Sequence, residues 1–322
     1  ATLTLNAANN IVFNTGANVI STAGALGLTL NAGGAISTMR SISLNGGTLT
    51  LNATGAVTQS SAITGNTSVV KNGAGTFTLS QNNTYTGATT IHAGTLALGA
   101  ANRIANTSAV TVSTGATFNL AGFTETVGSI AGGGNITLGA GTLTTGGDNT
   151  STTFSGSVSG TGGLAKTGTG TLTLSGTNTY TGTTTISAGT LAVSGGSAIA
   201  DSSQVTLANT AGAALNLAGN ETIGNLSGGG TTGGNVVLNG NTLTVNETAA
   251  TTYAGAISGA GGLIKEGAAA LTLSGANTYT GTTTIKGGTL QVGAGGTTGM
   301  LGTGVVSDNA ALLFNRGDAL SV

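Results

Sequence analysis

Cysteine, proline and tryptophan are absent from the 322 residues, and charged side chains make up only 5% of them. Without cysteine the chain has no disulfide, no thiolate metal site and no thiolate nucleophile. About a quarter of a typical soluble domain is charged, so threonine, serine and asparagine must hydrate the surface of this chain. The lack of cysteine also suits a protein that crosses an oxidising compartment before it folds, because nothing can crosslink prematurely.

An excess of one charge and long apolar runs are missing too. Seven basic and eight acidic residues leave a formal net charge of −1. Proteins that track phosphate backbones need clustered Lys and Arg, so we expect no nucleic-acid partner. Gly or Thr breaks every apolar run, whereas a membrane-spanning helix needs about 20 apolar residues. The chain begins at Ala1 without a signal peptide, which predicts a mature protein or an internal fragment.

Glycine is abundant, at 60 residues, and the sequence repeats itself. Three phrases are near-copies of one another: GTFTLSQNNTYTGATTIHAGTLALG from Gly75, GTLTLSGTNTYTGTTTISAGTLAVSG from Gly170 and ALTLSGANTYTGTTTIKGGTLQVG from Ala270. Their tyrosines lie 95 and 99 residues apart, and the lysines that precede the phrases, Lys71, Lys166 and Lys265, keep these spacings. The large repeating unit is therefore roughly 97 residues long, and its last copy is incomplete.

Shorter steps and a strand pattern occur inside each unit. The phrase LTLNA begins at Leu3 and returns at Leu28 and Leu49, and such short steps are typical of one solenoid turn, which takes roughly 20–25 residues. In Thr171–Leu174 the residues alternate between threonine and leucine, the period of a half-buried strand. Gly, Asn and Ser bound each strand, as in turns. We predict an all-β fold, a right-handed parallel β-helix whose turns of about 20 residues bury their apolar faces by stacking.

The alternation assigns an inward and an outward side to each copy of the phrase. The predicted structural core of the repeat is apolar and consists of Phe77, Leu79, Ile91, Leu96, Leu172, Leu174, Ile186, Leu191, Leu271, Leu273, Ile285 and Leu290. The predicted repeat turn contains Asn83, Tyr85, Gly87, Asn178, Tyr180, Gly182, Asn277, Tyr279 and Gly281. Each buried apolar side chain contributes roughly 1.5–3 kcal/mol to stability. We expect the tyrosines to cover the turn or to stack along one side of the coil.

The three phrases resemble the passenger-associated transport repeat of bacterial autotransporters. The shared pattern is G-x-G-T-L-T-L-S-G-x-N-T-Y-T-G-x-T-T-I-x-x-G-T-L-x-V, and the second copy fits it throughout. The first copy has Gln81 where the others have Gly176 and Gly275, and the third departs from the pattern over Glu266–Leu271. With the intervening turns, the resemblance extends over about residues 66–322.

The N-terminal region, residues 1–65, has a different character. LTLNAANNIVFNTGANVIST and SISLNGGTLTLNATGAVTQSSAITG resemble the coils of filamentous-haemagglutinin-type exoproteins. We therefore predict haemagglutinin-like coils over residues 1–65 and a β-helix with three copies of the large repeating unit over residues 66–322. Both regions are expected to form one continuous solenoid.

These resemblances imply a secreted or surface-displayed structural segment of an adhesin or stalk. They place it outside a Gram-negative bacterium, attached at the outer membrane, with an outer-membrane translocator as its partner during secretion and repeats that support secretion and folding. The host or abiotic surface ligand stays unidentified. One alternative is a self-assembling extracellular filament or matrix protein, joined end to end or laterally, because open β-helix ends template strand pairing. A polysaccharide-active enzyme is the third hypothesis.

Residues with catalytic or metal-binding chemistry are scarce, so we expect no enzyme, cofactor or metal site. His92 is the single histidine, and Ser187 and Lys286 occupy its place in the other copies. We interpret it as an exposed polar residue and not as a member of a catalytic triad. Asp148 occurs in one GGDNT stretch, without the repetition of calcium-binding β-rolls.

Acidic residues one coil apart are the remaining candidates for chemistry. Asp201 and Glu221 are separated by one solenoid step, and Glu247, Glu266 and Lys286 follow one another at steps of the same length. We interpret them as solvent-facing charge ladders, with a carboxylate pair for glycoside chemistry as the alternative.

Two further motifs have known binding counterparts. The tripeptide that integrins recognise occurs at Arg316–Asp318, where the other copies of the unit have Leu-Ala-Gly. Threonine arrays such as Thr169–Thr173 resemble those of ice-binding solenoids, but their spacing varies from coil to coil. We therefore assign neither cell attachment nor ice binding to the chain.

Overall fold

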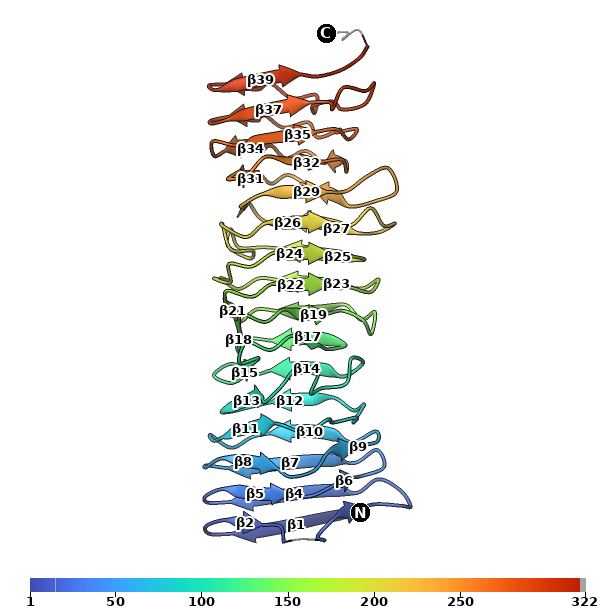
Figure 1. The fold of residues 1–322 in the computed structure, drawn as a ribbon, viewed down its shortest axis with the longest axis vertical. Coiled ribbons are helices and arrows are strands. Elements are labelled where there is room, and N and C mark those ends of the chain that lie inside the picture. The colour runs from blue at the N-terminus through green and yellow to red at the C-terminus, as the bar shows by residue number, and fades with distance from the viewer. Residues whose placement is uncertain (15, 319–322) are drawn as a thin grey trace. The chain divides into compact units, whose positions relative to one another are not determined.

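The computed structural model describes residues 1–14 and 16–318, and every regular element among them is a β-strand. The strands form a β-solenoid of about 15 turns with about 21 residues in each turn, which confirms the predicted all-β solenoid (Figure 1). The chain divides into two compact units, Ala1–Gly162 and Gly163–Val322. No helix in the described ranges is long and apolar enough to cross a bilayer.

The first unit contains four stacks of parallel strands. The longest stack has the order β1 (Thr2–Ala7), β4 (Gly27–Ala32), β7 (Thr48–Ala53), β10 (Ser68–Lys71), β12 (Thr89–Ile91), β14 (Ala109–Val112), β17 (Ser129–Gly132) and β20 (Thr152–Phe154). The second has the order β2 (Ile11–Val12), β5 (Ile36–Met39), β8 (Val57–Gln59), β11 (Thr76–Leu79), β13 (Thr95–Leu98), β15 (Thr117–Asn119), β18 (Asn135–Gly139) and β21 (Ser157–Gly160). The shorter stacks are β3 (Val19–Ile20), β6 (Ile42–Ser43) and β9 (Ile63–Thr64), and β16 (Glu125–Thr126) with β19 (Leu143–Thr145).

The second unit contains three such stacks. One has the order β22 (Leu164–Lys166), β24 (Thr184–Ile186), β26 (Val205–Leu207), β29 (Leu226–Gly228), β32 (Thr251–Tyr253), β35 (Ala270–Leu273), β37 (Thr289–Val292) and β39 (Ala311–Phe314). Another has the order β23 (Thr171–Leu174), β25 (Thr190–Val193), β27 (Ala214–Leu217), β30 (Asn235–Val237) and β33 (Ile257–Ser258). The third has the order β28 (Glu221–Ile223), β31 (Leu243–Asn246), β34 (Leu263–Glu266), β36 (Thr283–Ile285) and β38 (Val306–Asp308).

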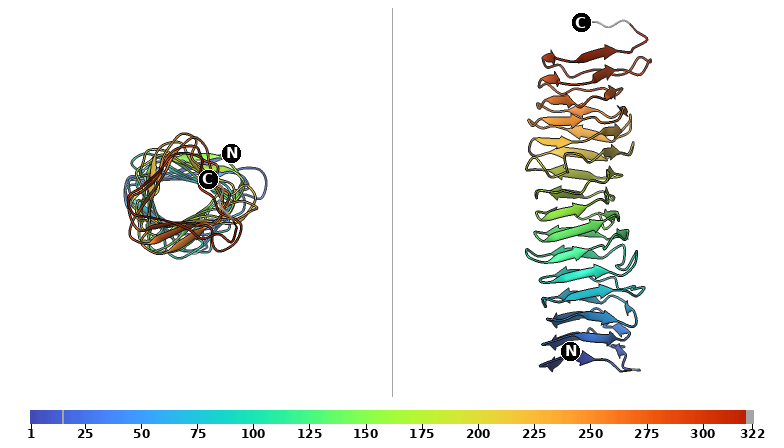
Figure 2. Two further views of the ribbon diagram at one scale, coloured as in Figure 1. Left: turned by 90° about the horizontal axis from the view of Figure 1, so that it is seen from above. Right: turned by 60° about the vertical axis from the view of Figure 1, so that its left-hand side comes forward.

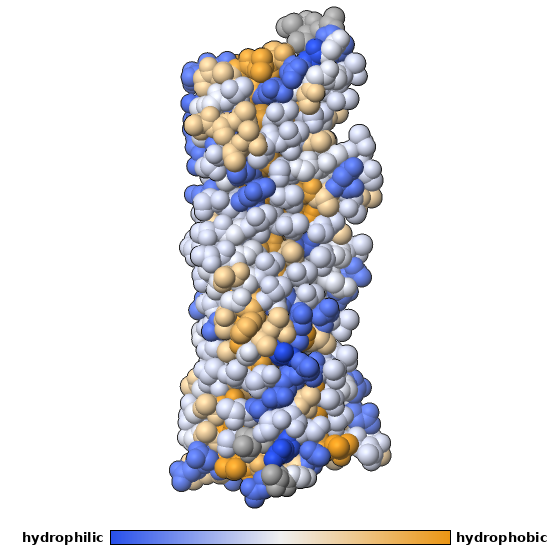
Figure 3. All heavy atoms as spheres, in the orientation of Figure 1, coloured by the Kyte–Doolittle hydropathy of each residue, from blue (hydrophilic) through white to orange (hydrophobic). Residues whose placement is uncertain are grey.

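Stacked strands place like residues above like residues. Leu28 of β4 pairs with Leu49 of β7, and Leu172 of β23 pairs with Leu191 of β25. Within each unit the coils lie one above another, and the strands surround a central region (Figure 2). Buried apolar side chains such as Leu28 and Leu172 fill this region. The face in view in Figure 3 is mostly of intermediate hydropathy, as a surface of threonine, serine and glycine should be. The period-two pattern therefore sorts leucine inward and threonine outward.

The structure places the predicted core residues in this interior. All twelve have at most 2% of their surface exposed. Strand pairing continues past residue 65, because β10 pairs with β7, and the boundary between the compact units follows Gly162. A separate region over residues 1–65 stays a prediction from sequence, and residue 15 and residues 319–322 of the two predicted regions lie outside the described residues.

Candidate functional site

A buried lysine that precedes each repeated phrase is held by backbone carbonyl groups. Lys166 is 1% exposed, and its Nζ donates hydrogen bonds to the carbonyl oxygens of Thr167 (2.6 Å), Gly168 (2.9 Å) and Ala188 (3.3 Å). The same arrangement recurs in the other copies, where Lys265 donates to Glu266, Gly267 and Gly287, and Lys71 donates to Gly73 and Ala93. The ammonium group thus ties the turn after its own strand to the next coil. Burial lowers the pKa of Lys71 to about 8, because the charged form loses hydration.

A glycine completes this turn in the following coil. Gly189 has a φ of +61°, and a Cβ at this position would lie 2.4 Å from the carbonyl oxygen of Gly168. Gly94 and Gly288 have φ values of +68° and +63° in the other copies. Only glycine combines this backbone conformation with so close an approach, which explains why the G of "AGT" or "GGT" recurs in each phrase.

A buried asparagine joins three successive coils. Asn277 is fully buried, its Oδ1 accepts a hydrogen bond from the N–H of Ile257 (2.8 Å), and its Nδ2 donates to the carbonyl oxygen of Met300 (2.7 Å). Asn83 likewise accepts from Ile63 (2.9 Å) and donates to Arg103 (3.2 Å), and Asn178 donates to Ala198 (2.6 Å). Where the chain leaves the strands, this side chain pairs backbone groups that no ladder reaches.

The three repeat tyrosines lie inside the coil, and not over a turn or along one side as we expected. Tyr85, Tyr180 and Tyr279 are all fully buried. The hydroxyl group of Tyr180 is 2.7 Å from Oγ1 of Thr184, which is 3.1 Å from Oγ of Ser203 in the next coil. Tyr85, Thr89 and Ser108 repeat this chain, and Tyr279 pairs with Thr283. A tyrosine can enter the core because its hydroxyl group finds a partner four residues along the chain.

The segment whose carbonyl group accepts a hydrogen bond from the repeat asparagine also donates hydrogen bonds to a buried glutamate. Glu221 is 2% exposed, and its carboxylate accepts hydrogen bonds from the N–H groups of Ile199 (2.7 Å) and Ala198 (3.3 Å). In the first unit Glu125 accepts from Ile104 (3.1 Å) and Arg103 (2.9 Å). Loss of hydration raises the pKa of Glu221 to about 7 and that of Glu125 to about 6, although the N–H donors oppose the shift. The prediction that Glu221 faces solvent is therefore wrong, because it serves backbone donors in the interior.

Glu247 is a third buried carboxylate and is only half-satisfied. Its Oε1 accepts hydrogen bonds from the N–H of Leu226 (3.0 Å) and from Oγ1 of Thr251 (2.9 Å). Its Oε2 is buried without a hydrogen-bond partner in the described structure. Burial raises the pKa of Glu247 to about 7. Of the predicted ladder, Glu266 and Lys286 form an exposed ion pair of 2.8 Å, whereas Glu247 lies in the interior and is not part of it.

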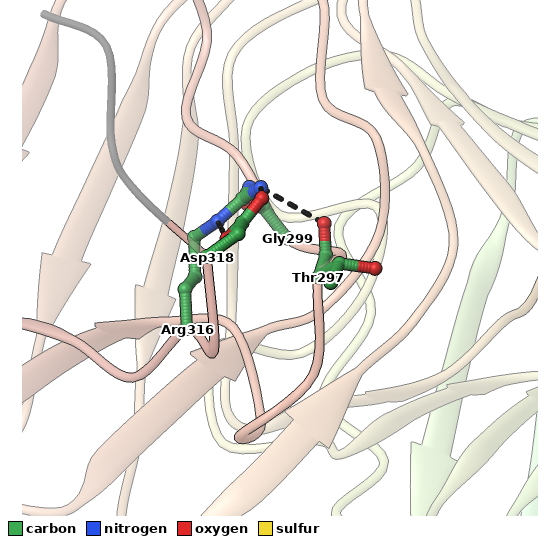
Figure 4. A network of polar contacts seen from close by, with 4 residues as sticks. All are labelled: Thr297, Gly299, Arg316 and Asp318. Carbon is green, nitrogen blue, oxygen red and sulfur yellow. Dashed lines mark hydrogen bonds and ion pairs between the residues drawn. The ribbon is translucent and has the colours of Figure 1, made fainter.

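The other candidates form no catalytic arrangement. His92 is exposed, and its Nδ1 is 3.1 Å from Oγ of Ser113. Within residues 1–14 and 16–318, no group of three or more His, Asp or Glu residues could hold a metal ion. In the integrin-type tripeptide, the Arg316 guanidinium pairs with the Asp318 carboxylate at 2.7 and 2.8 Å and also donates to the carbonyl oxygens of Thr297 and Gly299 (Figure 4). Its two charged side chains are therefore paired with each other.

Comparison with known protein families accounts for the repeated phrases. The passenger-associated-transport-repeat family matches residues 69–98, 164–193 and 263–292. These three segments are passenger-associated transport repeats. Each transport repeat contains the buried lysine, asparagine, tyrosine and threonine described above, and the buried glutamates Glu125, Glu221 and Glu247 lie outside it. The transport repeat therefore contains the polar side chains that connect one coil to the next.

A relative with a known name is an autotransporter adhesin. The chain is 40% identical over 97 residues to the adhesin BmaC autotransporter of Brucella suis biovar 1 (strain 1330). The match covers 30% of this chain and 3% of that protein, so the chain spans a small fraction of the relative's length. No solved structure matches the chain.

Sequence reasoning missed the roles of the buried lysines, threonines and glutamates. A signal for the lysines was present, because Lys71, Lys166 and Lys265 recur at fixed spacing in a chain with only seven basic residues. The spacing of Glu125 and Glu221 is likewise close to the length of the unit. A scarce charge that returns once in each unit indicates a fixed structural partner.

The buried glutamates make the protein less stable as the pH rises. Because the folded-state pKa of Glu247 is about 7 and the ordinary value is 4.5, the folded protein binds more protons than the unfolded chain between these values. The resulting stabilisation is complete below pH 4.5 and is lost as the pH rises through 7. We expect a higher melting temperature at pH 5 than at pH 8, measured by circular dichroism.

Two glutamine variants distinguish the cost of burying a charged carboxylate from the loss of its hydrogen bonds. Glu247→Gln can place its NH₂ group at the unpartnered position, so it should raise the melting temperature at pH 8 and change it little at pH 5. Glu221→Gln must turn an NH₂ group toward a backbone N–H, so it should destabilise at both pH values by about 1–3 kcal/mol. Equal effects of the two variants would contradict the assignment.

Proposed function

We propose that this chain is a structural segment of a surface-displayed adhesin of a Gram-negative bacterium, secreted through an outer-membrane translocator. One observation carries the proposal. Several polar residues that recur in all three transport repeats point inward and hydrogen-bond neighbouring coils, as Asn83, Asn178 and Asn277 do. These recurring residues therefore stabilise the fold. The match to transport repeats and to an adhesin autotransporter supports the same reading.

The arrangement favours folding by addition of one coil to the next. Each coil cannot bury its apolar face alone and needs a neighbour. The asparagine of a transport repeat bonds the coil before it and the coil after it, so it ties a newly formed coil to the folded part. Stacking outside the membrane would then oppose return of the chain. The low charge and the lack of cysteine and proline ease passage of the unfolded chain.

We infer a non-enzymatic role for this segment. Its buried carboxylates, Glu125, Glu221 and Glu247, accept hydrogen bonds from backbone N–H groups. A catalytic pair would instead direct its oxygens at a bound substrate. The carboxylates whose pKa values burial raises are thus engaged in holding coils together.

Surface display tests the proposal in the natural full-length protein. We expect the joint variant Asn83→Leu, Asn178→Leu and Asn277→Leu to reduce the protein on intact cells several-fold, measured by immunogold electron microscopy and by accessibility to external protease. The exposed neighbours Thr84, Thr179 and Thr278, substituted together by leucine, are the matched control. The unchanged protein should form structures tethered to cells. Cytoplasmic protein, or free filaments with a regular subunit repeat, would overturn the proposal.

A further inference from the structure

Two insertions in the second unit flank a single groove. Gly228–Asn235 has eight residues where the corresponding Gly132–Asn135 has four, and Val292–Met300 has nine where Val193–Ala198 has six. The correspondence follows from structure, since Gly228 and Gly132 end strands in equivalent positions and the repeat asparagines bond both Met300 and Ala198. The inserted loops follow β29 and β37 and project from the same edge of this unit (Figure 1). In solenoids, insertions that meet on one face often form the binding face.

The groove between the loops has a volume of about 890 Å³. Its floor consists of small residues from two successive coils, among them Ala254, Ser274 and Ala276. Gly275 of the floor could not carry a side chain, because its Cβ would lie 2.1 Å from the carbonyl oxygen of Gly255. Thr231 of the first insertion and Thr298 of the second line the two sides. A small-residue floor between two projecting loops gives a groove that crosses several coils.

A charge pair lines this groove. Arg316 and Asp318 both line it, and their side chains are joined by two hydrogen bonds of 2.8 and 2.7 Å. The guanidinium group is also held by the carbonyl oxygens of Thr297 (2.8 Å) and Gly299, which belong to the second insertion (Figure 4). The carboxylate keeps free acceptor capacity beside these donors. The pair therefore presents an acceptor and a polar edge without net charge.

The lining chemistry indicates the class of ligand. Among the described residues that line the groove, Arg316 and Asp318 are the only charged ones, and they neutralise each other. The remaining polar groups are neutral hydroxyl and amide groups, as in Thr231, Ser274 and Asn235. Hydroxyl groups both donate and accept hydrogen bonds, so a ligand rich in hydroxyl groups can match them. The methyl groups of the floor alanines suit the C–H faces of sugar rings.

We propose that this groove binds a neutral oligosaccharide. The lining residues belong to five successive coils, and coils stack about 4.8 Å apart, so the groove accommodates several sugar units. An ionic ligand would have to break the Arg316–Asp318 pair to gain a partner. The inference goes beyond the proposed scaffold role by giving the segment a ligand of its own. Sugar binding rests on the proposed surface display only for its role on the cell. Binding by the purified chain therefore tests the groove separately from surface display.

The test is binding of the purified 322-residue chain to an array of neutral hexasaccharides of glucose, mannose, galactose and N-acetylglucosamine in α and β linkage, followed by calorimetry of the best binder. Hexagalacturonate and a Ser/Thr-rich hexapeptide serve as acidic and peptide comparisons. We expect at least one neutral hexasaccharide to bind with a Kd below 1 mM, and both comparison ligands to bind at least tenfold more weakly. No binding on the array, or preference for either comparison ligand, would overturn the proposal.

Two variants locate the binding in the groove. Deletion of Gly230–Gly233 leaves Gly-Gly-Gly-Asn, the sequence of residues 132–135, and Ala276→Trp fills the floor. Each should weaken binding at least tenfold without changing the melting temperature. Thr177→Trp is the matched control, because Thr177 is exposed at the position of the second transport repeat that corresponds to Ala276. If Thr177→Trp weakens binding as much, or if neither groove variant does, the groove is not the site.

Discussion

Leu172→Asp is expected to lower the free energy of unfolding of the coils around it by about 3–5 kcal/mol, the usual cost of an uncompensated buried charge. Leu172 is 2% exposed and pairs with Leu191 of the next coil, so no solvent reaches a carboxylate at this position. Because the coils of a solenoid contact only their neighbours, the loss should be local. Native-state hydrogen exchange of β23 and β25 measures it directly.

Thr173→Asp is the matched control for this variant. Thr173 lies one residue along the same strand, and its side chain is partly exposed on the outward side. We expect it to change exchange by less than a tenth as much, since a surface substitution usually stays within about 0.5 kcal/mol. Loss of stability in Leu172→Asp should also diminish at pH 5, where more of the buried carboxyl group is protonated. Equal exchange in the two variants would contradict the inward and outward assignment.

The solenoid was predictable because its rules are local. Alternation as in Thr171–Leu174 defines a strand with one buried face, and glycine and asparagine define the turns. The short, regular step between similar strands then fixes which strands stack. None of these inferences requires knowledge of a distant contact, which is why the fold class and the inward leucines followed from short stretches of sequence.

The buried polar residues were not predictable in the same way. Glu221 reads as a surface charge, yet its partners are backbone N–H groups of Ala198 and Ile199, in the preceding coil. That pairing depends on how an irregular turn in one coil sits beneath a strand in another. Hydropathy describes the side chain alone, whereas Glu221 is buried because backbone N–H groups in the interior need a hydrogen-bond acceptor. The sequence signal for this role was the return of a scarce acidic residue, Glu125 and then Glu221, at about the length of the repeating unit.

The groove was likewise only partly predictable from the sequence. The extra residues in Gly228–Asn235 and Val292–Met300 are visible when the units are aligned. Their position beside one groove is not, since the two insertions lie about three coils apart and face the same side only because successive coils keep the same orientation. Arg316 and Asp318 read as an attachment motif in sequence, and the structure pairs them as part of the wall of the groove.

Asn277→Leu should be among the most destabilising substitutions that leave the apolar core intact. It preserves much of the volume but leaves the N–H of Ile257 buried without its partner, and it removes the donor to the carbonyl group of the partly exposed Met300. One unsatisfied buried polar group costs about 1–3 kcal/mol, so we expect a loss of about that size in urea unfolding at pH 8. Asn246→Leu is the matched control, because Asn246 is exposed on β31, and it should change stability by less than about 0.5 kcal/mol.

Asn277→Asp shows which of the two hydrogen bonds matters more. The carboxylate can still accept from Ile257, but it presents an oxygen to the carbonyl oxygen of Met300, 2.7 Å from the present Nδ2. Relative to the unchanged protein at the same pH, we expect a large loss at pH 8 and partial recovery at pH 5, because the protonated acid regains a donor. If Asn277→Leu and Asn246→Leu unfold alike, the asparagine does not stabilise the stacking of the coils, and the transport repeat must stabilise the solenoid through its other residues.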